Sequence, residues 1–256
     1  MAYNILISRF NWPHAVWKNN YDAAYQDWID VRFELLRRYT AKSARNFVRQ
    51  PDLWLVLASD YAHNVVERLQ TELWGLPYRL VLWSGKSEVD SIRDALSDLS
   101  FPSEVRTTRL DTDDLIASDY FLRLDQLQLP GDQVERGVAI SCPGGSIYLE
   151  NQNHFYFSSY PENPFLTYAE HVRSASELKT VHWTQHTTLI DDATHAKFIR
   201  SYHPMWASVV HNHNLGNQSL VDVCRFPSGD RAAHFSRFGL PAEFSAAPIP
   251  SASGAV

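Results

Sequence analysis

Short apolar runs alternate with amphipathic segments through the first 110 residues, and this alternation restricts the possible folds more than any other feature of the chain. The apolar runs have the length of buried strands and comprise residues 3–8, 53–58, 78–83 and 105–110. The segments between them repeat apolar side chains every three or four positions, as helices do, and comprise residues 21–39, 63–74 and 89–99. Strands and helices in this order form a mostly parallel sheet with helices on its faces. The sequence therefore predicts an α/β fold.

The pattern changes around Pro130, beyond a helix that we expect over residues 119–129 with Ser118 as its N-cap. A second helix is expected around residues 192–202. Three further strands are predicted, with a turn at residues 143–145, and they comprise residues 137–142, 146–150 and 154–157. These elements predict a smaller, mixed C-terminal part.

One domain is expected over residues 1–240, with a ligand-binding half at 1–130 and a second half at 131–240. From Pro241 onward the chain is mainly Ala, Pro and Ser, so residues 241–256 are expected to form a disordered tail. This composition has too few large apolar side chains to offset the entropy of ordering.

Charge and composition exclude some classes of protein. The net charge of −6 and the absence of a basic patch argue against a nucleic-acid-binding protein. No run of about 18 apolar residues is present, so no transmembrane segment is expected. The first ten residues do not resemble a signal peptide, and Cys142 and Cys224 are expected to be buried thiols, as in cytoplasmic proteins.

Three carboxylates follow the predicted strand at residues 105–110, namely Asp111, Asp113 and Asp114. Ligands of open α/β sheets usually bind at the carboxyl ends of the strands, which is where this cluster falls. Carboxylates this close together repel one another unless a cation, hydrogen bonds or water stabilise them. Oxygen ligands of this kind suit Mg²⁺ or Mn²⁺. The alternative is a solvated acidic loop.

Several cationic and polar side chains are candidates for binding an anionic ligand. Arg32 interrupts the apolar stripe of the predicted helix at 21–39, where an unpaired guanidinium would be costly. Its planar fork suits a diphosphate, although a structural salt bridge would explain it equally well. We expect Arg32 to point toward Asp113. Arg9 and Asn11 follow the first strand and are expected at the same edge of the sheet.

Histidines are concentrated in the last third of the chain. His182 and His186 are four residues apart, but their surroundings predict an extended segment, and no nearby Cys or Glu completes a zinc site. His211 directly follows the apolar run Trp206–Val210 and could complete a metal site with Asp113. The alternative is a histidine that only hydrogen-bonds to the backbone at the edge of the core.

At these residues the sequence resembles the putative rhamnosyltransferase family of bacterial glycosyltransferases. The similar segments extend over most of residues 1–220 and comprise Arg9-Phe10-Asn11, Trp28 with Arg32, Leu53 to Asp60, Thr107 to Asp114 and His203 to Asn214. The acidic segment is the most specific of these, and the segment from Trp206 to Asn214 is the second. Residues 39–43 and Asn212 depart from the family pattern.

This resemblance implies a GT-A-like fold and a nucleotide-diphosphate sugar as the donor. It also implies that the D-x-D motif binds a divalent cation, Mn²⁺ or Mg²⁺. The expected metal ligands are Asp111, Asp113 and His211. The expected donor-binding residues are Arg9, Asn11, Arg32, Arg109 and Asp111. The expected catalytic residues are Asp113, Asp114 and Glu150.

In such a reaction the cation would stabilise the leaving diphosphate. An inverting transfer also needs a group that accepts the proton of the acceptor hydroxyl, and the candidates are Glu150, Glu170 and Asp191. The acceptor itself is not indicated by the sequence. Two other interpretations stay open: a metal-dependent phosphatase or hydrolase that uses the acidic cluster, and a non-catalytic carbohydrate-binding protein that uses the many aromatic side chains.

Overall fold

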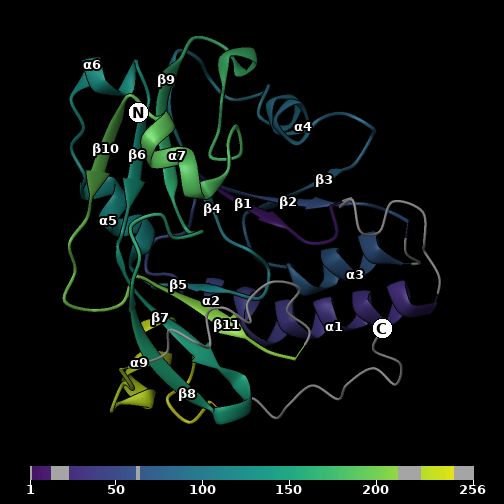
Figure 1. Cartoon of the computed structure of the whole chain (residues 1–256). Helices are drawn as coiled ribbons and strands as arrows, with labels where there is room; N and C mark the ends of the chain where they lie inside the picture. The colour runs from purple at the N-terminus through teal and green to yellow at the C-terminus, as the bar shows by residue number, and fades with distance from the viewer. Residues whose placement is uncertain (1, 13–22, 62–63, 213–225, 245–256) are drawn as a thin grey trace.

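The computed structural model describes residues 2–12, 23–61, 64–212 and 226–244. Its main element is a seven-stranded sheet (Figure 1). In spatial order the strands are β10 (His195–Phe198), β6 (Val138–Ser141), β9 (Thr167–Val172), β4 (Ser103–Arg109), β1 (Ala2–Arg9), β2 (Leu53–Ala58) and β3 (Tyr78–Leu82). All neighbours are parallel except β9, which is antiparallel to β4 and β6. The predicted mostly parallel sheet is therefore confirmed.

Helices cover both faces of this sheet. On one face lie α1 (Ala23–Arg38) and α3 (Val65–Glu72), and on the other lie α4 (Glu88–Ala95) and α7 (His186–Asp192) (Figure 1). Most of the apolar side chains that the periodicity singled out form two separate cores, one against each face, while Leu35 and Tyr39 belong to a third. A short helix, α2 (Thr40–Ala44), continues α1, and α5 (Tyr120–Gln126) and α6 (Gly131–Val134) precede β6.

A second, four-stranded mixed sheet is present, which confirms a smaller mixed part, although residues 131–240 also supply β6, β9 and β10 to the seven-stranded sheet. The strands of this second sheet are β5 (Leu115–Ile116), β11 (Trp206–Val210), β7 (Gly144–Leu149) and β8 (His154–Ser159). β11 is parallel to β7 and antiparallel to β5. A third core lies between this sheet, α1 and α9 (Arg231–Arg237), and is rich in aromatic rings such as Tyr148, Phe155 and Phe235. Much of the unusual aromatic content is thus used for packing.

Four expectations about local structure are wrong. Residues 192–202 are not a helix: α7 ends at Asp192, and β10 then pairs with β6, because tertiary pairing prevails over local propensity. The segment around His182 and His186 was expected to be extended, but its residues from His186 onward are helical, because α7 begins there. The N-cap of α5 is Asp119 and not Ser118. The strand at residues 78–82 is not buried, because β3 is an edge strand and only Val81 is fully covered.

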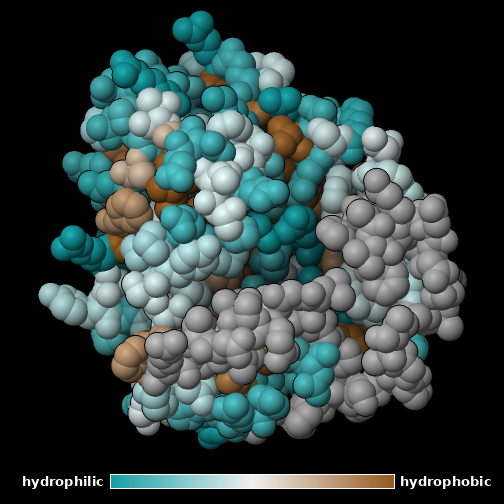
Figure 2. Space-filling model, viewed as in Figure 1, coloured by the Kyte–Doolittle hydropathy of each residue, from teal (hydrophilic) through white to brown (hydrophobic). Residues whose placement is uncertain are grey.

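The packed part of the chain extends past the predicted start of the tail. Phe244 is buried and its ring contacts those of Tyr39 and Phe235, while residues 245–256 lie outside the described part. Cys142 is a buried free thiol, as expected, and Cys224 is outside the described residues. None of the described helices has both the length and the apolar character needed to cross a membrane. On the face shown in Figure 2, the described surface is mainly polar.

The turn after β4 connects the two sheets and thereby places the acidic cluster. The chain leaves the seven-stranded sheet at Arg109 and enters the four-stranded sheet at Leu115, so residues 111–114 span the junction. The backbone is held there by hydrogen bonds from Leu110 N to Ile7 O and from Asp114 N to Asp111 O. The cluster lies at the carboxyl end of β4, as the sequence predicted.

Candidate active site at the junction of the two sheets

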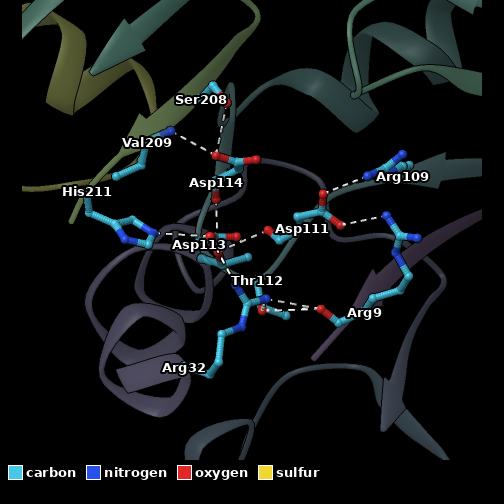
Figure 3. Close-up of polar contacts among 11 residues, drawn as sticks. Arg9, Arg32, Arg109, Asp111, Thr112, Asp113, Asp114, Ser208, Val209 and His211 are labelled. Carbon is cyan, nitrogen blue, oxygen red and sulfur yellow. Dashed lines mark hydrogen bonds and ion pairs between the residues drawn. The ribbon is translucent and has the colours of Figure 1, made fainter. Parts of the chain in front are cut away.

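The three carboxylates of the acidic cluster point in three different directions (Figure 3). Asp111 faces Arg9 and Arg109, at the carboxyl ends of β1 and β4. Asp113 faces Arg32 of α1 and His211, the residue after β11. Asp114 faces the backbone of β11. The mutual repulsion expected from sequence is thus reduced by separating the charges and giving each carboxylate its own partners.

Asp113 is the point where distant segments meet. Its Oδ2 atom lies 3.0 Å from Arg32 Nη1 and 3.2 Å from His211 Nε2. All three side chains are largely buried, His211 almost completely. Burial alone would raise the pKa of Asp113, but the charge of Arg32 and the hydrogen bond with His211 hold it below its usual value. The carboxylate is therefore ionised at neutral pH.

Arg32 is fixed by more than one contact. Besides Asp113, its guanidinium donates to the hydroxyl of Thr112 and to the carbonyl oxygen of Arg9, the latter at 3.3 Å. It also lies 5.8 Å from the centre of the Trp28 ring. The expectation that Arg32 points toward Asp113 is met by this geometry. The contacts explain how α1 tolerates a cation on its apolar face: the guanidinium reaches the polar junction between the sheets.

Asp111 is clamped by two arginines. Its Oδ2 atom accepts from Arg109 Nη2 at 2.8 Å, and its Oδ1 atom lies 3.7 Å from Arg9 Nη2. Burial would raise the pKa of Asp111, but the charges of Arg109 and Arg9 more than offset it, so the pKa is well below the usual range. One carboxylate thus organises two guanidinium groups at the edge of the sheet.

The Asp114 carboxyl group points toward β11. Its Oδ1 atom accepts a hydrogen bond from Val209 N at 2.8 Å and lies 3.4 Å from Ser208 Oγ. Burial, together with the charges of Asp113 and Asp111, raises the pKa of Asp114 well above its usual value. The carboxyl group attaches the junction to β11, which brings His211 toward Asp113.

Asn11 does not lie free at the edge of the sheet as expected. It is almost fully buried, and its amide joins the ends of β1 and β2. The side chain donates to Tyr25 Oη and to Ser59 O, and it accepts from Ser59 N. These contacts engage both the nitrogen and the oxygen of the Asn11 side-chain amide within the protein.

The candidate proton acceptors are differently placed. Glu150 is buried and accepts from Arg38 Nη1 at 3.0 Å and from Tyr39 Oη at 2.7 Å. Glu150 lies beside His211, because Leu149 and Val210, the residues before them, pair in the parallel strands β7 and β11. Glu170 accepts from the backbone N–H groups of Lys179 and Thr180, and burial raises its pKa. Both carboxylates are engaged with the protein, while Asp191 is exposed on α7.

Sequence reasoning did not assign four residues to this site, although it had considered two of them, His182 and His186, as a zinc pair and set that aside. Thr112 lies within the acidic motif, and its hydroxyl contacts Arg32. His186 lies 3.2 Å from Arg109, with its Nδ1 atom facing Nη1. His182 Nδ1 lies 2.8 Å from Glu88 Oε1, and the contact with His182 and the charges of Arg9 and Arg109 lower the pKa of Glu88 against the effect of burial. Only Thr112 had a sequence signal, its place between the aspartates; the others come from segments that nothing local connects to the motif.

The three expected metal ligands are not gathered into one set. Asp111 is turned toward Arg9 and Arg109, and no group of three or more His, Cys, Asp or Glu side chains in the described part of the chain is arranged to hold a metal ion. Asp113 and His211 do fit as a pair. Two adjacent ligands of an octahedral ion, each about 2.1 Å from it, are about 3 Å apart. The separation of Asp113 Oδ2 and His211 Nε2 is 3.2 Å.

Comparison with solved structures shows distant likenesses. The inositol-1-phosphate CTP transferase from T. maritima is 11% identical, with 86% of this chain and 94% of that chain covered and a TM-score of 0.42. TarS 1-349 from S. aureus is 10% identical, with 82% and 60% covered and a TM-score of 0.42. Rv0371C from Mycobacterium tuberculosis H37Rv, in complex with manganese, is 11% identical, with 86% and 98% covered and a TM-score of 0.39. No curated protein matches the chain.

The family comparison is more direct. Residues 5–222 match the model of a family described as putative rhamnosyl transferase. This range includes β1 with Arg9, α1 with Arg32, the acidic junction and β11 with His211. It agrees with the resemblance found in the sequence. Because the match spans most of the chain, the protein belongs to the putative rhamnosyl transferase family and is a glycosyltransferase.

Proposed function

We propose that the protein transfers a hexosyl or deoxyhexosyl group, rhamnose in particular, from a nucleotide-diphosphate donor, with Mn²⁺ or Mg²⁺ bound at Asp113 and His211. One observation supports this most strongly. The two side chains are 98 residues apart in sequence, yet Oδ2 and Nε2 lie 3.2 Å from each other. The remaining coordination positions would be filled by diphosphate oxygens and water, which is how Mg²⁺ sites with few protein ligands are usually completed.

The charges around the junction suit this reaction. As the bond between the sugar and the diphosphate breaks, negative charge develops on the leaving group. The cation supplies Lewis-acid stabilisation of that charge when it is bound. Arg9, Arg32 and Arg109 approach the same junction from β1, α1 and β4, and they supply donors for the phosphate oxygens. Asp111 orients two of them.

A thermal-shift panel tests the proposal. UDP, dTDP, GDP and CDP are added to the protein with and without Mn²⁺, and the melting temperature is measured. A ligand at about 100 times its Kd adds roughly 2.7 kcal/mol of stability, so at least one diphosphate should raise the melting temperature, and more so with Mn²⁺. Stabilisation by none of them would contradict a nucleoside-diphosphate site, and release of phosphate from a simple monoester would favour the hydrolase interpretation instead.

Replacement of Arg32 by Lys should weaken binding of the nucleoside diphosphate by about tenfold, because charge-assisted hydrogen bonds are lost. Arg32 contacts Asp113, Thr112 and the Arg9 carbonyl simultaneously, and a single ammonium group cannot reproduce that fork. Isothermal titration with the diphosphate selected by the panel measures the effect. Arg68→Lys is the control, since Arg68 forms an exposed ion pair with Asp30. Unchanged affinity in folded Arg32→Lys protein would contradict a phosphate-binding role.

A further inference from the structure

His186 contacts the same arginine that holds Asp111. It is the first residue of α7, and its Nδ1 atom lies 3.2 Å from Arg109 Nη1. Arg109 Nη2 meanwhile donates to Asp111 at 2.8 Å. A guanidinium has only donors, so Nδ1 must be the acceptor of this hydrogen bond. In a ring with an unprotonated Nδ1, the proton resides on Nε2, and His186 is therefore neutral.

The surroundings favour this neutral form of His186. Burial lowers the pKa of His186, and the positive charges of Arg109 and Arg9 lower it further against the opposing effect of Asp111, to about 4. The tautomer needed to accept from Arg109 is thus the stable state near neutral pH. His186 orients the guanidinium by a hydrogen bond and adds no negative charge.

A neutral acceptor matters because of the charge balance at this edge of the sheet. Arg9 and Arg109 both make their ionic contacts with a single carboxylate, Asp111. The nearby carboxylate of Glu88 is in direct contact with His182. A second carboxylate in the place of His186 would orient Arg109 equally well, but it would cancel much of the positive charge that an anionic ligand needs.

We propose that His186 is a positioning residue for the nucleotide-diphosphate donor, holding Arg109 toward the junction without neutralising it. The inference rests on the proposed function and adds a residue from the segment between β9 and β10 to it. The ligand class is a diphosphate, because the arginine that His186 orients lies at the end of β4 and pairs with Asp111, two residues before the proposed cation ligand Asp113. His186 acts through Arg109 and not on the reacting atoms.

Three substitutions at this position separate orientation from charge. His186→Gln supplies a neutral acceptor, His186→Glu an anionic acceptor, and His186→Leu none. The Kd of the diphosphate that most stabilises the wild type, among UDP, dTDP, GDP and CDP with Mn²⁺, is measured by isothermal titration. His186→Gln should bind within about threefold of wild type, while His186→Glu and His186→Leu should bind about tenfold more weakly, as expected for one charge-assisted hydrogen bond. His171→Gln, an exposed histidine on β9, is the matched control.

The pattern across the series decides the matter. A purely structural role predicts that the melting temperature changes while Kd does not, or that Gln and Glu behave alike, and either result would overturn the proposal. Loss of binding in His186→Gln equal to that in His186→Leu would overturn it too. Wild-type protein that binds none of the four diphosphates would contradict the proposed function and this inference together, whereas normal wild-type binding with an unchanged variant series would contradict this inference alone.

Discussion

Replacement of Asp113 by Asn should reduce metal-dependent glycosyl transfer by roughly 10²- to 10³-fold, the effect typical of removing one electrostatic contact to the transition state. The amide has nearly the same shape but no charge, so it would bind a divalent cation weakly and leave Arg32 without its ionised partner. Binding of Mn²⁺, followed by electron paramagnetic resonance in the presence of the diphosphate, should be lost in parallel. This readout does not require knowledge of the acceptor.

The comparison with two other variants makes this test specific. His211→Ala should weaken Mn²⁺ binding and transfer less than Asp113→Asn does, because it removes one neutral ligand and leaves the carboxylate. Asp98→Asn removes an exposed carboxylate that is paired with Arg79 far from the junction, and it should leave both measurements unchanged. Circular dichroism establishes that each variant is folded. Full Mn²⁺ binding by folded Asp113→Asn protein would show that the cation site lies elsewhere.

Replacement of Gly145 by Ala should destabilise the protein by about 3 kcal/mol, the upper part of the range for overpacking a buried site. A Cβ atom on Gly145 would fall within the indole ring of Trp206. That ring cannot move aside easily, because it is buried, stacked on Phe165 with 5.1 Å between ring centres, and its Nε1 atom donates to Cys142 O at 2.8 Å. Urea unfolding followed by tryptophan fluorescence measures the change.

The neighbouring glycine is a matched control for this prediction. A Cβ atom on Gly144 would have its nearest neighbour, Ser201 O, at 3.9 Å, which is ordinary van der Waals contact. Gly144→Ala should therefore change stability by less than about 1 kcal/mol. Equal stability of the two variants would show that the region around Trp206 relaxes, and that the contact between β7 and β11 is not closely packed.

Much of the first half of the fold follows from local pattern. The apolar run at residues 53–58 coincides with β2, and the run at 3–8 lies within β1. Buried strands and amphipathic helices differ in period and length, so each segment carries enough information to identify its own type. The acidic residues directly follow one of these strands, and because ligands of open α/β sheets usually bind at the carboxyl ends of the strands, their position already indicated this edge of the sheet. The strand–helix alternation then determined the fold class.

Local pattern failed where contacts between distant segments decide the structure. Residues 195–198 pair with β6 as strand β10, although their own sequence suggested a helix. Burial of β3 was overestimated, because the sequence cannot show that a strand will lie at the edge of a sheet. Both errors concern partners that lie far along the chain, and propensity is a weak guide when tertiary pairing supplies more free energy.

The acidic motif shows the same division within four residues. Its composition determined that these carboxylates must find cations or donors, since close like charges are unstable together. Only the tertiary structure decided that Asp111 pairs with two arginines, that Asp113 meets Arg32 and His211, and that Asp114 binds the backbone of β11. The physical reason is that these partners belong to separate strands and helices, which the packing of the two sheets brings to one junction.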